Sequence, residues 1–169
     1  MNEFPQVLLK TYERVYASRK TVAALRILDR LAVILSGVIF AISAYFAFCR
    51  STLDTIKLIL LAAIPFVLVS ALRKILSSKR PYEIIDFSDF SPNPPHYKLG
   101  SSFPSRHVFS AFVIAVLAFE YAWYLGALGL ALGIILAVCR VVLGIHFSKD
   151  VICGGVIGII SGIIGTLIL

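Results

Sequence analysis

The chain has 169 residues, of which 59% are hydrophobic and 15% charged, and its mean hydropathy is +0.93. Soluble domains are about 45–50% apolar, so this composition excludes an ordinary soluble domain, and the length suits one compact unit over residues 1–169. The net charge of +7 would suggest a nucleic-acid partner in a soluble protein. In a membrane protein it is typical of basic flanks beside anionic lipid, so we expect the membrane as partner and no nucleic acid.

The N-terminal segment Phe4–Leu25 mixes apolar positions with lysines and arginines. This pattern is typical of an amphipathic helix that lies on the membrane surface. A solvated helix outside the membrane fits the same pattern equally well. Met1–Arg30 is too charged for a cleavable signal peptide and lacks the apolar stretch that such a peptide needs.

Five apolar runs follow, and a helix needs about 20 residues to cross the hydrocarbon core of a bilayer. The sequence therefore predicts an all-α, polytopic membrane helix bundle with about five transmembrane helices and the N-terminal amphipathic helix. The predicted spans are Leu31–Cys49, Leu58–Leu72, His107–Trp123, Leu125–Leu143 and Val151–Leu169. The glycines of the last span offer small faces for close helix packing: Gly154, Gly155, Gly158, Gly162 and Gly165.

Between the second and third spans, Tyr82–Phe103 is rich in proline and serine and is therefore expected to be a loop. Its aromatic residues are suited to the headgroup region, where they would anchor the loop at the interface or shape an entrance for lipid. These aromatic residues are Phe87, Phe90, Tyr97 and Phe103.

Three groups of basic and histidine residues interrupt the apolar sequence. They are Arg73 with Arg80-Pro81, then Pro104-Ser105-Arg106-His107, and last Arg140 with His146 and Asp150. The second predicted span ends at Arg73, the loop returns on the same side to Ser105, and the next two spans form a hairpin that brings the chain back near Arg140. Span parity therefore predicts that all three groups lie at one face of the membrane. Taken singly, each group would more simply be a basic anchor beside a span.

His146 and Asp150 are four residues apart, which places them on one face of a helix. Asp150 can then accept a hydrogen bond from one imidazole nitrogen, which fixes the tautomer and makes the other nitrogen the better nucleophile. Arg140 needs a break in the helix near Gly144 to point at the same centre. A His-x-x-x-Asp pair that stands alone is more often structural.

Ser105 follows a proline and is expected to be the N-cap of a helix, where free backbone N–H groups attract an anion. His107, on the first turn, is placed to give a proton to a leaving oxygen. As a lone residue, it would equally well be an interfacial polar side chain. Arg73, Arg80 and Arg140 carry forked donors that match the oxygens of a phosphate.

The order and spacing of these residues resemble the type 2 phosphatidic acid phosphatase (PAP2) superfamily of membrane lipid phosphatases. Its pattern is Lys-x6-Arg-Pro, then Pro-Ser-Gly-His, then Ser-Arg-x5-His-x3-Asp. The chain matches the pattern at Arg80-Pro81, Pro104-Ser105, His107, Arg140, His146 and Asp150. Three positions depart from it, because Arg73 replaces the lysine, Arg106 the glycine and Cys139 the serine. Arg106 adds a cation that suits a diphosphate or a more anionic head group.

The resemblance implies hydrolysis of a lipid phosphate in the bilayer through a phosphohistidine intermediate, with no metal and no cofactor. His146 would attack phosphorus, Asp150 would orient His146, and His107 would protonate the leaving oxygen. The phosphoryl oxygens would be held by Arg73, Arg80, Ser105, Arg106 and Arg140. Among lipids, a polyprenyl diphosphate such as undecaprenyl diphosphate, or a glycerophospholipid phosphate such as phosphatidylglycerol phosphate, is our first choice.

Two other functions fit parts of the sequence. An anion or lipid transporter could use the basic groups as its site, but they gather at one face instead of the membrane midplane, and no inverted repeat is visible. A scaffold that has lost catalysis is disfavoured by the complete set of His107, His146 and Asp150.

Two arguments about the orientation of the site in the cell membrane conflict. The resemblance implies a site that faces outward. With five spans, the N-terminal segment would share that face, and its basic residues would break the positive-inside tendency: Lys10, Arg14, Arg19, Lys20, Arg26 and Arg30. Either the site faces the cytoplasm, or part of the N-terminal segment crosses the membrane as a sixth span. The sequence carries no signal for the oligomeric state.

Overall fold

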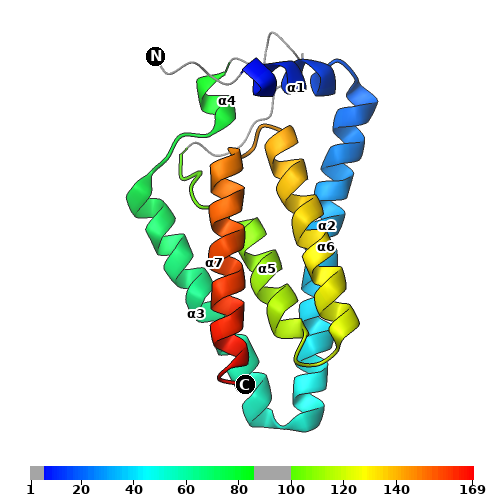
Figure 1. The fold of residues 1–169 in the computed structure, drawn as a ribbon, viewed down its shortest axis with the longest axis vertical. Coiled ribbons are helices and arrows are strands. Elements are labelled where there is room, and N and C mark those ends of the chain that lie inside the picture. The colour runs from blue at the N-terminus through cyan, green and yellow to red at the C-terminus, as the bar shows by residue number, and fades with distance from the viewer. Residues whose placement is uncertain (1–5, 86–99) are drawn as a thin grey trace.

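The computed structural model describes residues 6–85 and 100–169. Within these ranges the regular elements are all helices, so the predicted all-α fold is confirmed. In chain order they are α1 (Gln6–Tyr16), α2 (Arg19–Arg50), α3 (Thr52–Leu76), α4 (Pro81–Ile84), α5 (Arg106–Ala118), α6 (Trp123–Val142) and α7 (Ser148–Thr166). Figure 1 shows the long helices running along the bundle and α1 lying across one of its ends.

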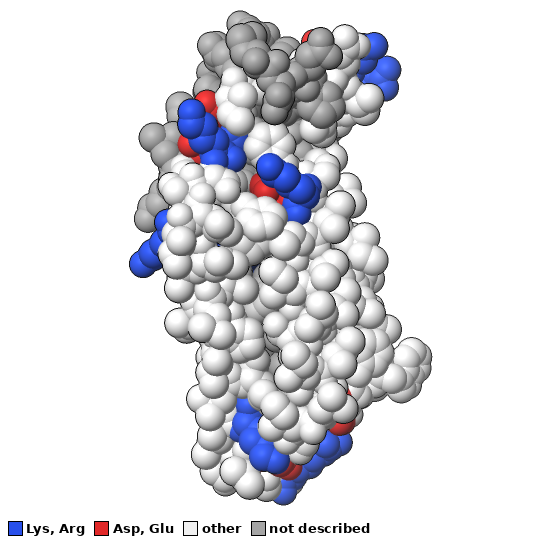
Figure 2. All heavy atoms as spheres, turned by 60° about the vertical axis from the view of Figure 1, so that its left-hand side comes forward, with Lys and Arg blue, Asp and Glu red and all other residues white. Residues whose placement is uncertain are grey.

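Four helices of the described ranges, α2, α3, α6 and α7, are long and apolar enough to cross a membrane. The remaining expected span, α5, has 13 residues and contacts all four of them, so protein surrounds much of it instead of lipid. On the face drawn in Figure 2, lysines and arginines gather toward the two ends, and a broad uncharged band separates them. The chain is therefore a multi-pass membrane protein, as predicted.

The N-terminal segment differs from the prediction of one helix over Phe4–Leu25. Helix α1 ends at Tyr16, and Ser18 is the N-cap of α2, with its hydroxyl accepting from the N–H of Thr21 at 3.4 Å. The first span therefore begins at Arg19, well before the expected Leu31. Helix α1 has 11 residues, too few to cross a bilayer, so the described N-terminal residues do not form a sixth span.

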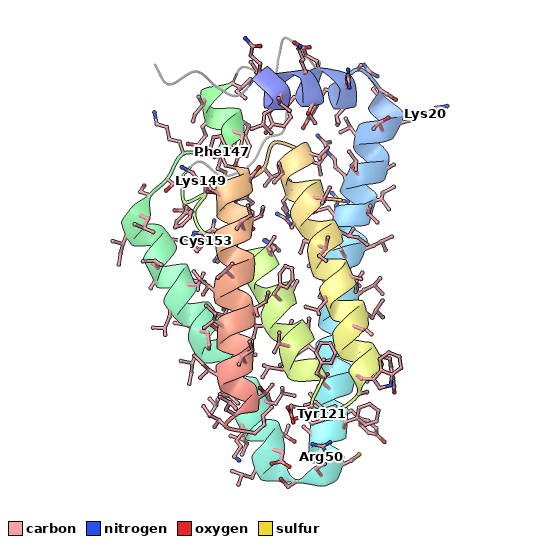
Figure 3. All side chains as sticks on the ribbon, in the orientation of Figure 1. Lys20, Arg50, Tyr121, Phe147, Lys149 and Cys153 are labelled. Carbon is pink, nitrogen blue, oxygen red and sulfur yellow. The ribbon has the colours of Figure 1, made fainter. Side chains whose placement is uncertain are left out.

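The third span also differs from its predicted boundary, because α5 stops at Ala118 instead of reaching Trp123. A tight turn follows, in which the N–H of Tyr121 donates to the carbonyl of Ala118 at 3.1 Å. Trp123 then begins α6. Figure 3 shows Arg50 and Tyr121 together at this far end of the bundle, where the Arg50 guanidinium carbon lies 5.0 Å from the centre of the Tyr121 ring.

The glycines of α7 allow close approach to α5, as their spacing predicts. A Cβ at Gly154 would lie 2.6 Å from the carbonyl oxygen of Ser105, and a Cβ at Gly158 would lie 2.6 Å from that of Phe109. Any larger residue at either position would push the backbone of α5 away. This contact holds the start of α5, with Ser105 and His107, against the start of α7, with Asp150.

Candidate active site

The three basic and histidine groups meet in one pocket. A cavity of about 290 Å³ is lined by four arginines, two histidines and one isoleucine. These residues are Arg73, Arg80, Arg106, His107, Arg140, Ile145 and His146. Asp150 and Ser105, the other predicted site residues, are fully buried and are not among the residues that line the cavity. The structure thus brings together residues from α3, α5 and α6 and from the segments that follow α3 and α6.

His146 lies in the short connection between α6 and α7. Helix α6 ends at Val142, and Gly144 has a φ of +65°, a conformation that glycine adopts without strain. The carbonyl of Arg140 then accepts from the N–H groups of Ile145 at 3.0 Å and His146 at 3.1 Å. The expected break near Gly144 is therefore present, and it lets Arg140 and His146 line the same cavity.

The prediction that His146 and Asp150 share a helical face is wrong, because α7 begins only at Ser148. Asp150 lies in the first turn of α7, where its Oδ2 accepts from the N–H of Phe147 at 3.0 Å. The Nδ1 atom of His146 lies 3.6 Å from Asp150 Oδ2, which is longer than a hydrogen bond. The two side chains are close, but a third residue completes their connection.

That residue is Ser102, which the sequence analysis did not single out. Its buried hydroxyl donates to Asp150 Oδ2 at 2.5 Å, and its oxygen lies 3.2 Å from His146 Nδ1. Because the hydroxyl proton is used by the carboxylate, the Ser102 oxygen accepts from Nδ1–H. The Nε2 atom of His146 is then the nitrogen with the free lone pair. One serine among several in a loop gave no signal of this role.

Burial keeps His146 neutral. The side chain is 1% exposed, and the loss of water lowers its pKa to about 4, against the opposite effect of the nearby Asp150 carboxylate. Burial wins because an imidazolium loses more hydration than this partner restores. At neutral pH the imidazole is therefore uncharged, which is the form that a nucleophile requires.

Ser105 is the N-cap of α5, as predicted, but its side chain makes no capping hydrogen bond. Its backbone N–H donates to the carbonyl of Asp150 at 2.9 Å, which ties the start of α5 to the first turn of α7. The Ser105 hydroxyl is completely buried and has no partner among the described residues. His107, on the first turn, lines the pocket.

Two of the pocket arginines hold the loop before α5. Arg73 is 5% exposed and donates from Nη1 to the carbonyl of Pro104 at 2.9 Å and from Nη2 to the carbonyl of Ser101. Arg80 donates from Nε to the carbonyl of Gly100 at 3.3 Å. These bonds use only some of the five N–H donors of each guanidinium. Arg73 and Arg80 therefore shape the loop and still line the cavity.

The other two arginines have different surroundings. The Nε of Arg140 forms an ion pair with Oδ1 of Asp29 on α2, at 2.7 Å. In the sequence analysis Asp29 had no role, because it lies far from the three groups along the chain. Arg106 lies with its guanidinium carbon 6.0 Å from the centre of the Phe66 ring.

An apolar cavity adjoins the basic pocket. It has a volume of about 350 Å³ and shares Arg106 and His107 with that pocket, while its other walls include Val33, Phe66 and Leu136. A further cavity of about 210 Å³ continues it, with Phe66, Ser110 and Ile114 common to both. The series leads from the arginines into the apolar part of the bundle, between α2, α3 and α5.

The described residues include no group of three His, Cys, Asp or Glu side chains arranged to hold a metal ion. Of the loop aromatics named above, Phe87, Phe90 and Tyr97 lie outside the described residues. Phe103 is half-buried.

Comparisons with known proteins concern the family and the fold of the chain. The sequence profile of the PAP2 superfamily matches residues 54–169. The Bacitracin transport permease protein BcrC of Bacillus licheniformis is 28% identical over 111 residues, which are 63% of this chain and 53% of that protein. The chain thus spans about half the length of this curated relative.

Two crystal structures are similar to the whole bundle, each with a TM-score of 0.69. LpxE of Aquifex aeolicus is 24% identical, with 99% of this chain and 98% of that one covered. The first transmembrane PAP2 type phosphatidylglycerolphosphate phosphatase from Bacillus subtilis is 21% identical, with 98% of this chain and 87% of that one covered. At these identities the likeness concerns the fold.

Proposed function

This chain belongs to the PAP2 superfamily, and on that premise we propose that it is a membrane phosphatase that removes the terminal phosphate of a lipid phosphate through a phosphohistidine intermediate. The observation that carries the proposal is the position of His146. Its Nδ1 lies 3.2 Å from Ser102 Oγ, which leaves Nε2 free, and the residue lines a pocket with four arginines. A neutral nucleophile beside four cations is suited to attack on a bound phosphate.

The reaction has two steps. In the first, the Nε2 lone pair of His146 forms a bond to phosphorus while the bond from phosphorus to the leaving oxygen breaks, and His107 gives that oxygen a proton. The negative charge of a bound substrate favours the imidazolium form of His107, which this step needs. In the second, His107 takes a proton from water as the water oxygen attacks phosphorus, the P–N bond breaks, and inorganic phosphate leaves.

The arginines stabilise the charge that builds on the phosphoryl oxygens in both transition states. Arg140 lies in the last turn of α6, Arg73 in the last turn of α3, and Arg80 in the segment that follows α3, and all three line the pocket. Asp150 and Ser102 hold His146 in one tautomer, so that no proton has to leave Nε2 before the attack.

The apolar cavities support a lipid as the substrate. They meet the basic pocket at His107, the residue that protonates the leaving group, so the lipid chain of the leaving group would extend into them. A polyprenyl diphosphate or a glycerophospholipid phosphate fits this arrangement. Arg106 lines both the basic pocket and the adjoining cavity, where it suits the second phosphate of a diphosphate.

The proposal is tested by phosphate release from the detergent-purified protein, with EDTA present, on a lipid phosphate monoester and a polyprenyl diphosphate. We expect release by the wild-type protein, a loss of at least about 10³-fold in His146→Ala, and inhibition by vanadate, which mimics pentacoordinate phosphorus. Release that survives in His146→Ala contradicts the proposal. Lipid flux in proteoliposomes without any hydrolysis would favour a transporter.

A further inference from the structure

A buried ion pair links the phosphate pocket to a helix that supplies none of its lining. Asp29 on α2 and Arg140 on α6 approach to 2.7 Å, and their side chains are 12% and 11% exposed. Just beyond the pair, Ala32 and Leu136 belong to the core between these helices. A carboxylate on a membrane helix is costly unless a partner or a function retains it.

The pair involves only one edge of the Arg140 guanidinium. Asp29 Oδ1 lies at Nε, so the terminal Nη groups are left for the cavity that Arg140 lines. Among the four pocket arginines, Arg140 alone has an ion pair with a carboxylate within residues 6–85 and 100–169. Because a guanidinium is planar, fixing its Nε edge also fixes the direction of the other donors.

The same residue is connected to the nucleophile through its backbone. The carbonyl of Arg140 accepts from the N–H of His146 at 3.1 Å. A carboxylate that holds Arg140 therefore affects two parts of the site. One is the Arg140 guanidinium, which would bind the phosphate, and the other is the α6–α7 connection, which carries the His146 imidazole. Neither the motif spacing nor the match over residues 54–169 includes Asp29.

We propose that Asp29 is a positioning residue, which acts through Arg140 to aim its Nη donors at the transferring phosphoryl group. The inference rests on the phosphatase function proposed above. If Asp29 has this role, its removal should weaken the binding of the transition state more than the binding of the substrate. Vanadate, which resembles the transition state, would then lose affinity along with kcat.

A double-mutant cycle tests this dependence on Arg140. We expect Asp29→Ala to lower kcat about 10- to 100-fold with KM changed less than about threefold, and to weaken vanadate binding by a similar factor to kcat. We expect Asp29→Glu to recover most of the loss. In an Arg140→Ala background, adding Asp29→Ala should change kcat by less than about threefold, because the residue through which it acts is gone.

The matched control is Ser43→Ala on the same helix. Ser43 is 1% exposed like a core residue, and its hydroxyl donates to the carbonyl of Ile39 at 2.9 Å within α2, away from the pocket. Its kcat and vanadate affinity should equal those of the wild type. Vanadate affinity is measured by calorimetry on the folded, monodisperse fraction, so that loss of folded protein does not enter it.

Losses that add in the double variant would overturn the inference, because Asp29 would then act independently of Arg140. The inference would also be overturned if the folded fraction of Asp29→Ala had the kcat and the vanadate affinity of the wild type. Asp29 would then be a purely structural partner of Arg140. Absence of phosphate release by the wild-type protein is a different outcome, which contradicts the proposed function itself.

Discussion

The hydroxyl of Ser102 donates a hydrogen bond to Oδ2 of Asp150 at 2.5 Å, and both residues are completely buried. The bond joins the loop before α5 to the first turn of α7, two segments separated by the α5–α6 hairpin. His146 Nδ1 lies 3.2 Å from the same hydroxyl oxygen. The nucleophile is thus oriented by a serine and an aspartate together.

Replacing Ser102 with alanine tests this relationship. The change removes a hydrogen bond to a buried carboxylate, which is worth about 1.5–3 kcal/mol, so we expect kcat to fall about 10- to 100-fold. The neighbouring Ser101→Ala is the control, because only the Ser101 backbone carbonyl bonds to Arg73. Steady-state phosphate release measures both, and equal activities of the two variants would show that Ser102 does not orient His146.

The depressed pKa of His146 predicts a pH-dependent stability. The unfolded chain protonates this imidazole near its ordinary pKa of 6.5, whereas the folded protein resists protonation until about pH 4. Between these values the unfolded state binds more protons, so the free energy of unfolding falls as the pH falls, by about 3 kcal/mol in total. Above pH 6.5 the contribution is fully present.

The thermal unfolding midpoint in detergent, measured from pH 7 to pH 4, checks this expectation. The wild-type midpoint should fall more steeply with acid than that of His146→Gln, which has no group to protonate. Parallel curves for the two proteins would mean that burial of His146 contributes nothing to the acid sensitivity.

The close approach of α5 and α7 makes Gly158 sensitive to any side chain. A Cβ there would lie 2.6 Å from the carbonyl oxygen of Phe109, so we expect Gly158→Ala to destabilise the fold by about 1–3 kcal/mol. Gly37→Ala is the control, since a Cβ at Gly37 has nothing within 4 Å. The thermal unfolding midpoints of the two variants are compared in the same detergent. Equal midpoints would show that α5 can move away from the new methyl group without loss of stability.

The sequence predicted the features that local chemistry imposes. Apolar runs of bilayer length identified the spans, and the spacing of Arg140, His146 and Asp150 predicted which residues gather at one end. It did not predict Asp29, because an ion pair between α2 and α6 depends on how the helices pack and leaves no local pattern. Ser102 escaped notice for the same reason.

Two of the wrong boundaries have physical reasons that are visible afterwards. Ser18, a good N-cap residue, separates α1 from α2. This N-cap signal was missed because the charged residues around Ser18 made the whole segment resemble one amphipathic helix. His146 lies outside the helix that holds Asp150, because the positive φ of Gly144 ends the path of α6 before α7 begins. Periodicity alone cannot place a residue in a connection of this length.

Arg106 replaces a glycine of the family pattern, and Arg106→Gly tests what the arginine adds. If it binds the second phosphate of a diphosphate, the change should lower kcat/KM about tenfold for a polyprenyl diphosphate and less than threefold for the corresponding monophosphate. The exposed Lys149, at the start of α7 in Figure 3, gives the control Lys149→Ala, which should alter neither value. An equal loss of kcat/KM on both substrates would show that Arg106 does not determine the specificity for a diphosphate.

Formation of a covalent phosphohistidine is the most direct test of the proposed chemistry. Wild-type protein, mixed rapidly with a lipid phosphate labelled in the terminal phosphate and quenched in alkali, should carry an acid-labile label on the peptide that contains His146. His107→Ala should acquire the label more slowly than the wild type, since the first step needs His107 as acid, and His146→Ala should carry none. Turnover by the wild-type protein with no label, or with the label on another residue, would contradict a nucleophilic role for His146.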